Sequence, residues 1–147
     1  MKVKITRLDS RFTDIPLPQY VTRGAAGMDL CAAVPRAITV RPGQTVLVPT
    51  GFSIELPAGF EAQIRPRSGL AIKHNVGLLN SPGTIDSDYR GEIKIVLSNF
   101  GNKHFTIRRG DRIAQMIVAK YVRVNWAEVK KLNRSKRGKG GFGHTGK

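Results

Sequence analysis

The feature that most constrains the fold of this chain is a short alternation of apolar and polar residues, repeated along the chain and interrupted by turns. Apolar side chains occupy every second position at 52–56, 60–64 and 93–97. In an extended strand such side chains lie on one face, so each run predicts a half-buried β-strand. Proline or glycine marks turns between the runs, at 41–43, 57–59, 81–83 and 109–111. Many short strands with such turns predict an all-β domain, either a β-sandwich or a barrel.

Two segments depart from this pattern. Residues 68–74 have a short helical pattern, with Ser68 as a possible N-cap. Residues 133–147 contain five glycines and no aliphatic residue, so they cannot bury a core. We expect this segment to be disordered alone and to become ordered over a ligand. The chain is therefore predicted to have a β-rich core, residues 1–132, and a flexible, basic, glycine-rich C-terminal arm, residues 133–147.

Positive charge dominates the composition and indicates a polyanionic partner. The chain has 25 lysines and arginines against 10 aspartates and glutamates, for a formal net charge of +15. Nucleic acid and a nucleoside triphosphate are both polyanions. Every charged residue from Lys130 onward is positive, which predicts a basic tail rather than a basic face. Phe142 is the only aromatic residue in that tail, too few to stack bases, so the pattern favours a triphosphate over nucleic acid.

The compartment is predicted from the apolar pattern. No apolar run approaches the roughly 20 residues that a membrane helix needs, so we expect no membrane partner. Residues 1–7 begin an alternating pattern and lack the apolar centre of a signal peptide, which predicts a cytoplasmic protein. The single cysteine, Cys31, lies among apolar residues, and we expect a buried structural thiol.

Residues 83–92 carry the densest group of candidate catalytic side chains, namely Asp86, Asp88 and Tyr89. In an extended segment, two aspartates at this spacing point to the same side, and a carboxylate beside a water can act as a general base. The same residues also fit a turn in which the aspartates cap backbone amides. Alone they favour the turn, whereas the arginines and glycines elsewhere in the chain favour catalysis.

Two further segments suit anion binding. Arg67, Ser68 and Gly69 can open the short helix, where an arginine and backbone N–H groups attract phosphate, although an ordinary capped helix fits equally well. Gln115 is a polar side chain inside the apolar run 113–118, and it faces either a ligand or a neighbouring strand.

Five segments, in this order and spacing, resemble the five motifs of the homotrimeric deoxyuridine triphosphatases (dUTPases). They span the chain from Ala25 to Gly146 and lie at 26–30, 65–71, 83–92, 110–115 and 137–146. The resemblance implies a jelly-roll-like β-subunit and a threefold trimer with active sites between subunits. It also implies hydrolysis of dUTP to dUMP and pyrophosphate with Mg²⁺, which limits uracil incorporation into DNA and supplies dUMP for thymidylate synthesis.

The resemblance also implies a role for each matching residue. Asp86 resembles the catalytic residue that positions the attacking water and contacts the deoxyribose 3′-OH. Tyr89 resembles the tyrosine that packs under the sugar and excludes a 2′-OH, and Asp29 resembles the aspartate that holds Mg²⁺ through water. The residues that resemble the uracil-reading edge are Asn80, Thr84, Ile85, Asp86 and Lys94. Those that resemble phosphate contacts are Arg67, Ser68, Gly69 and Gln115. Those that resemble the clamping residues of the arm are Arg137, Phe142, Gly143, His144 and Thr145.

The chemistry suits these roles, because attack at a polyanionic phosphorus needs charge neutralisation and an oriented water more than covalent help. One position departs from the family pattern: His144 stands where the family usually has serine. The nearest alternative is a dCTP deaminase of the same fold, but the segment Gly91 to Lys94 follows the dUTPase pattern. A basic nucleic-acid-binding protein is the alternative from a different class.

Overall fold

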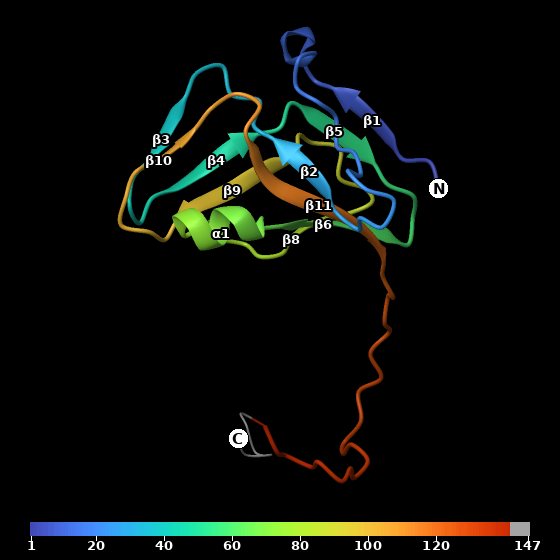
Figure 1. Cartoon of the computed structure of the whole chain (residues 1–147). Helices are drawn as coiled ribbons and strands as arrows, with labels where there is room; N and C mark the ends of the chain where they lie inside the picture. Colours follow the sequence, from blue (N-terminus) through green and yellow to red (C-terminus); the bar gives the residue numbers. More distant parts are fainter. Residues whose placement is uncertain (142–147) are drawn as a thin grey trace.

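The structure, a computed structural model, describes residues 1–141; residues 142–147 lie outside the described part of the chain. It consists of short antiparallel strands, one α-helix and one 3-10 turn (Figure 1). The strands are β1 (Lys4–Arg7), β2 (Met28–Cys31), β3 (Ile38–Val40), β4 (Thr45–Pro49), β5 (Phe52–Glu55), β6 (Phe60–Arg65), β7 (Val76–Leu78), β8 (Gly83–Ile85), β9 (Lys94–Asn99), β10 (Phe105–Ile107) and β11 (Arg112–Lys120). The helices are α1 (Ser68–His74) and the 3-10 turn η1 (Ser10–Phe12).

The three alternating runs are strands, as predicted. They correspond to β5, β6 and β9. The strands pair in small sheets whose orders are β1–β5, β10–β3, β4–β9–β7 and β2–β11–β6–β8. Within residues 1–141 these sheets pack as a sandwich and do not close into a barrel. The predicted all-β class is therefore confirmed, and the sandwich is the alternative that the chain adopts.

The apolar faces of the sheets form one main core. Its largest fully buried aliphatic side chains include Leu30 of β2, Ile95 and Leu97 of β9, Ile107 of β10 and Ile113 of β11. Burying a side chain of this size contributes about 1.5–3 kcal/mol relative to leaving it exposed. A shift of one residue in a strand would turn these side chains to solvent, so the core fixes the strand register and with it the positions of the polar residues described below.

The single α-helix has the predicted bounds, but its cap differs from the prediction. Arg67, not Ser68, is the N-cap: its backbone is extended, and its carbonyl accepts hydrogen bonds from the amides of Leu70 and Ala71. Ser68 is the first residue of the helix. The 3-10 turn at 10–12 was not predicted; Asp9 caps it by accepting a hydrogen bond from the Arg11 amide at 2.8 Å.

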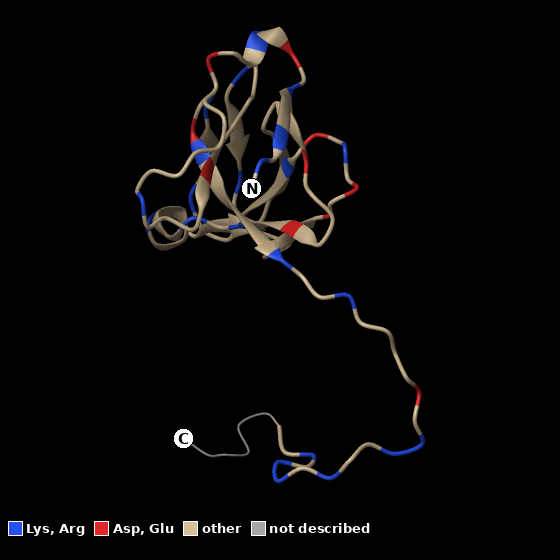
Figure 2. Cartoon of the chain, turned by 90° about the vertical axis from the view of Figure 1, so that its right-hand side faces the viewer, with Lys and Arg blue, Asp and Glu red and all other residues tan. Residues whose placement is uncertain are grey.

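The C-terminal segment leaves the body of the molecule after β11 and runs away from it (Figure 1). Trp126, in this segment, is 93% exposed. Figure 2 shows mostly lysines and arginines along this segment, with one acidic residue among them, whereas the body carries both signs of charge. The predicted boundary between core and arm, at 132/133, falls inside the extended segment and stays a prediction. Phe142, Gly143, His144 and Thr145 lie outside the described residues.

Within residues 1–141 no helix is long and apolar enough to cross a membrane.

Candidate active site

The register of the four-stranded sheet brings three of the predicted segments together. Strand β11 lies between β2 and β6, and Gln115 stands opposite Asp29 on one side and opposite Arg65 on the other. Directly opposite side chains in antiparallel strands have Cβ atoms about 4.5–5.5 Å apart. The segments 26–30, 65–71 and 110–115 therefore meet in one row across this sheet.

Asp29 is held in this row by two arginines. Arg67 Nε donates to Asp29 Oδ1 at 2.9 Å, and Arg112 Nη1 donates to Asp29 Oδ2 at 3.3 Å. Arg67 Nη1 also donates to the backbone carbonyl of Arg112 at 3.1 Å. The side chains of Asp29 and Arg67 are 24% and 25% exposed, so water screens this ion pair only in part. The sequence did not indicate Arg112 as a member of the site, because its charge differs in no way from that of a surface arginine.

Gln115 is positioned by contacts from two neighbouring segments. Its Nε2 donates to the Pro66 carbonyl at 2.9 Å, directly before Arg67. A Cβ on Gly27 would lie 2.6 Å from Gln115 Oε1, so only glycine leaves room for this side chain at its present position. The structure thus shows Gln115 bonded to a neighbouring segment, and its contact with a ligand stays a prediction.

The first turn of α1 leaves backbone donors available. The amides of Leu70 and Ala71 both donate to the Arg67 carbonyl, so those of Ser68 and Gly69 have no partner within the helix. Arg67 also borders a cavity of about 540 Å³. We refer to Asp29, Arg67, Ser68, Gly69 and Gln115 together as the phosphate-side group of residues.

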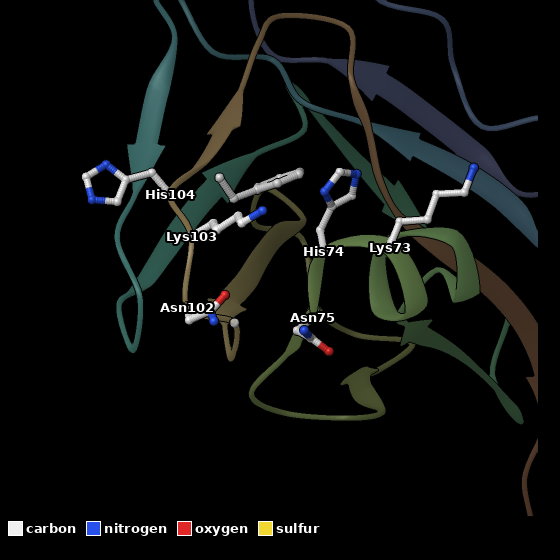
Figure 3. A pocket seen from close by; sticks show the side chains of 8 residues that line it. Lys73, His74, Asn75, Asn102, Lys103 and His104 are labelled. Carbon is white, nitrogen blue, oxygen red and sulfur yellow. The ribbon is translucent and has the colours of Figure 1, made fainter.

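A second cavity, of about 250 Å³, lies at the other end of α1 (Figure 3). The figure shows Lys73, His74 and Asn75 on the helical side and Asn102, Lys103 and His104 on the facing loop. The His74 and Phe105 rings pack with their centroids 5.3 Å apart. The lining is basic but contains none of the predicted site residues, so this cavity is not the candidate active site.

The remaining predicted site residues on β8 and β9, and the turn that connects these strands, line a different cavity. Its volume is about 330 Å³, and the side chains that line it are those of Leu47, Thr84, Ile85, Asp86, Tyr89, Glu92 and Lys94. Strand β8 pairs with β6 on one side and is the last strand of its sheet, so its other edge offers unpaired backbone N–H and C=O groups. Asn80 lies beside this strand, with its Nδ2 3.0 Å from where a Cβ on Gly83 would be. We refer to Asn80, Thr84, Ile85, Asp86, Tyr89 and Lys94 together as the nucleoside-side group of residues.

Asp86 and Asp88 lie in a turn, not in an extended segment. The Tyr89 amide donates to the Asp86 carbonyl at 3.2 Å and closes the turn directly after β8. The turn alternative is thus correct for the backbone. The predicted capping role is not observed, because neither carboxylate accepts a hydrogen bond from residues 1–141. Asp86 is therefore free to bind a water or a ligand hydroxyl.

Within residues 1–141, a single chain does not place the phosphate-side group and the nucleoside-side group on one cavity. Arg67 borders one cavity, whereas Asp86 and Tyr89 border another. Arg137, the one predicted arm residue in the described part, lies in the extended C-terminal segment, where its Nε donates to the Gly140 carbonyl at 2.9 Å. Each group is formed within the chain, and the complete constellation is not.

The donor set suits a magnesium ion held mainly by a ligand. Within the described residues no three His, Cys, Asp or Glu side chains cluster as a metal site. Mg²⁺ commonly keeps several waters and binds through one or two carboxylates together with substrate phosphates. Asp29, beside the predicted phosphate contacts, can supply such a carboxylate through a bridging water, and the residues present fit this mode.

The fold and the two groups suit a β-sandwich protein of the nucleotide-binding class, and comparison with known proteins gives the family. The dUTPase family model matches residues 13–146. A deoxyuridine 5′-triphosphate nucleotidohydrolase of Rickettsia prowazekii (strain Madrid E) is 58% identical over 146 residues, covering 99% of this chain and 97% of the relative. The same-named protein of Anaplasma marginale (strain St. Maries) is 56% identical over 146 residues, covering 99% of each chain. This chain belongs to the dUTPase family.

Solved structures give the same fold at lower identity. A mutant dUTPase of Staphylococcus bacteriophage 80alpha, with dUpNHpp, matches with a TM-score of 0.86 at 20% identity, covering 99% of this chain and 98% of that chain. A mutant dUTPase from phage phi11 of S. aureus, with a structural Mg(II) ion, matches with a TM-score of 0.80 at 17% identity, covering 91% of this chain and all of that chain. The predicted jelly-roll-like β-fold is thereby confirmed.

Proposed function

We propose that this chain is a Mg²⁺-dependent dUTP diphosphatase, which hydrolyses dUTP to dUMP and pyrophosphate, with Asp86 as the residue that orients and deprotonates the attacking water. Membership of the dUTPase family supports the activity. One observation carries the catalytic assignment: Asp86 follows the free edge of β8, its carboxylate accepts no hydrogen bond from residues 1–141, and it shares a cavity with Tyr89. By limiting dUTP, the enzyme would limit uracil in DNA and supply dUMP for thymidylate synthesis.

The nucleoside-side group of residues binds uracil and deoxyribose. The free edge of β8 presents backbone donors and acceptors, which can pair with the polar edge of a base as a neighbouring strand would. Asn80 and Lys94 complete this edge. The Tyr89 ring packs under the sugar, where a 2′-OH would meet an apolar surface without a hydrogen-bond partner. Asp86 accepts from the 3′-OH and from the water.

The phosphate-side group of residues neutralises the charge of the triphosphate. Arg67 and the amides of Ser68 and Gly69 donate to phosphate oxygens, and Gln115 adds a neutral donor or acceptor beside them. Asp29 fixes the Arg67 guanidinium before substrate binds and would help to hold Mg²⁺ through a water. When bound, the metal ion polarises the phosphates and reduces their charge.

The separation of the two groups supports a homotrimer with shared sites. The nucleoside-side group of one subunit would face the phosphate-side group of a neighbouring subunit. The arm would then cover the bound nucleotide, with Arg137, Gly143, His144 and Thr145 on the phosphates and Phe142 over the uracil. Light scattering on the active protein should give a trimer, and a fully active monomer would contradict the shared site.

Subunit mixing tests the shared site more directly. Arg67→Ala and Asp86→Asn each disable one group, so either variant alone should have little activity. Co-expression of the two should restore part of it, because some sites in mixed trimers contain both intact groups. No recovery from co-purified mixed trimers would indicate that both groups act within one subunit.

The activity itself is tested by pyrophosphate release from dUTP, dCTP, dTTP and UTP. We expect release from dUTP and little from the others, whereas ammonia release from dCTP would indicate the deaminase alternative. Asp86→Asn should lower the rate about 10²–10⁴-fold, the usual contribution of a general base. Asp88→Asn is the matched control in the same turn and should leave the rate near that of the native chain. Equal rates for the two variants would contradict the assignment of Asp86.

A further inference from the structure

The ring of Tyr89 is held by contacts with two residues that follow it in the chain, Gly91 and Glu92. Its hydroxyl donates to the Glu92 backbone carbonyl at 3.0 Å. A Cβ on Gly91 would lie 2.3 Å from the Tyr89 hydroxyl oxygen, so the ring packs directly against the glycine backbone. The position of Tyr89 therefore depends on where the backbone at Gly91 and Glu92 lies.

The Glu92 side chain ties this backbone to the short connection between β4 and β5. Its Oε1 accepts a hydrogen bond from the Gly51 amide at 2.9 Å, and its Oε2 lies 3.5 Å from Lys94 Nζ. The side chain is only 19% exposed. Gly51 has a φ of +77°, and a Cβ there would lie 2.9 Å from the Phe12 ring, so this amide donor has a fixed place.

A separate pair of hydrogen bonds anchors the following strand. The Thr50 hydroxyl donates to the Ile93 carbonyl at 2.5 Å, and the Ile93 amide donates to the Phe52 carbonyl at 3.1 Å. The Ile93 side chain is fully buried. Removal of the Glu92 carboxylate should therefore free the loop 86–92 without detaching the core segment at Ile93.

We infer that Glu92 is a positioning residue for deoxyribose selectivity: its carboxylate, bound to the Gly51 amide, holds the seat on which Tyr89 lies. The inference rests on the proposed role of Tyr89 under the sugar. Loss of the tie lets the Tyr89 ring move away from the sugar, which lowers activity on dUTP and opens space for a 2′-OH. Glu92 itself does not touch the reacting atoms.

The test compares the ratio of kcat/KM for dUTP to kcat/KM for UTP in Glu92 variants. Glu92→Ala should narrow this ratio about tenfold or more while the protein stays folded, as thermal unfolding and circular dichroism would show. Glu92→Gln keeps a carbonyl oxygen for the Gly51 amide and should retain most of the native ratio. Glu92→Asp keeps the charge but is too short to reach, and should behave like the alanine variant. Glu55→Ala is the matched control. It removes a carboxylate of the neighbouring strand β5, which is paired with Lys4 of β1, and it should leave the ratio unchanged.

Tyr89→Ala separates failure of this inference from failure of the proposed function. If Tyr89→Ala narrows the dUTP/UTP ratio and no folded Glu92 variant does, the positioning role is wrong and the role of Tyr89 stands. If Tyr89→Ala leaves the ratio unchanged, the sugar contact itself is wrong. In the Tyr89→Ala background, Glu92→Ala should change the ratio no further; an independent additional loss would overturn the coupling. If Glu92→Ala does not fold, the aspartate and glutamine variants decide in the same way.

Discussion

Replacement of Asp29 tests whether the phosphate-side group of residues is already positioned before substrate binds. Asp29→Ala removes the acceptor of Arg67 Nε and of Arg112 Nη1 and leaves two partly exposed arginines side by side without their shared carboxylate. Hydrogen bonds to charged groups contribute about 1.5–3 kcal/mol where they are buried, and exposed pairs contribute about 0–1 kcal/mol. With Asp29 and Arg67 about one quarter exposed, we expect a loss of about 1–3 kcal/mol in the free energy of unfolding. For a domain of this size that corresponds to a Tm decrease of about 2–10 °C.

The same change should lower kcat/KM for dUTP by about 10–100-fold, because Arg67 must then be ordered at the moment of phosphate binding. Asp29→Asn keeps an oxygen for Arg67 Nε but loses the charge, so it should fall between the alanine variant and the native chain on both measures. Differential scanning calorimetry and pyrophosphate release give the two values. Native values of both Tm and kcat/KM for Asp29→Ala would refute the reasoning, because the arginines would then be positioned without their common partner.

Three further perturbations address other parts of the chain. Deletion of residues 134–147 should leave the Tm of the core unchanged and lower activity sharply, because in our proposal the arm completes the charge clamp and excludes water. Within the arm, His144→Ser should keep most of the activity, and His144→Ala should lower the activity about fivefold, which corresponds to the loss of about one hydrogen bond. Hydrogen bonds from neighbouring arginines lower the pKa of Asp9 to about 2 and also lower the pKa of Asp14. Since an unfolded aspartate has a pKa of about 3.9, this stabilisation is complete above about pH 5 and is lost as the pH falls through the folded values; urea unfolding from about pH 5 to pH 2 should show the loss, reduced in Asp14→Asn. Burial raises the pKa of the Cys31 thiol, so iodoacetamide should react slowly with the native chain and quickly in urea.

The sequence predicted those features that depend on local periodicity. The runs at 52–56, 60–64 and 93–97 are strands because alternate side chains must face one core. The helix at 68–74 also has its predicted bounds. Its cap was misassigned because serine is the common N-cap residue, whereas here the extended backbone of Arg67 ends the preceding segment and the Arg67 carbonyl starts the helical hydrogen bonds.

The contacts that hold the site residues were not predictable from the sequence, because they join segments far apart in the chain. One hydrogen bond joins Glu92, in the connection between β8 and β9, to Gly51, in the connection between β4 and β5. Arg112 reaches Asp29 only because β11 pairs with β2, and this pairing includes a register shift between Arg112 and Ala114. Gly91 carries no side chain that could suggest a role, and its importance is that the Tyr89 ring occupies the space a Cβ would need. The motif segments could be named from the sequence, but the contacts by which Gly91, Glu92 and Arg112 position other residues of those segments could not.

The division of the chain into two groups also has an energetic consequence. Asp29 fixes Arg67, and Glu92 fixes the seat of Tyr89, before any ligand binds. Immobilising a mobile side chain at an interface costs about 0.5–1.5 kcal/mol, so preformed groups bind substrate with less loss of entropy. In the proposed shared site, assembly of subunits would bring two ordered halves together, and the entropic cost of closing the site would fall mainly on the arm. Such a division would keep nucleoside recognition rigid, where one hydroxyl is to be excluded. The adjustable contacts would then be those between the arm and the phosphates, whose charge tolerates several arrangements of cationic donors.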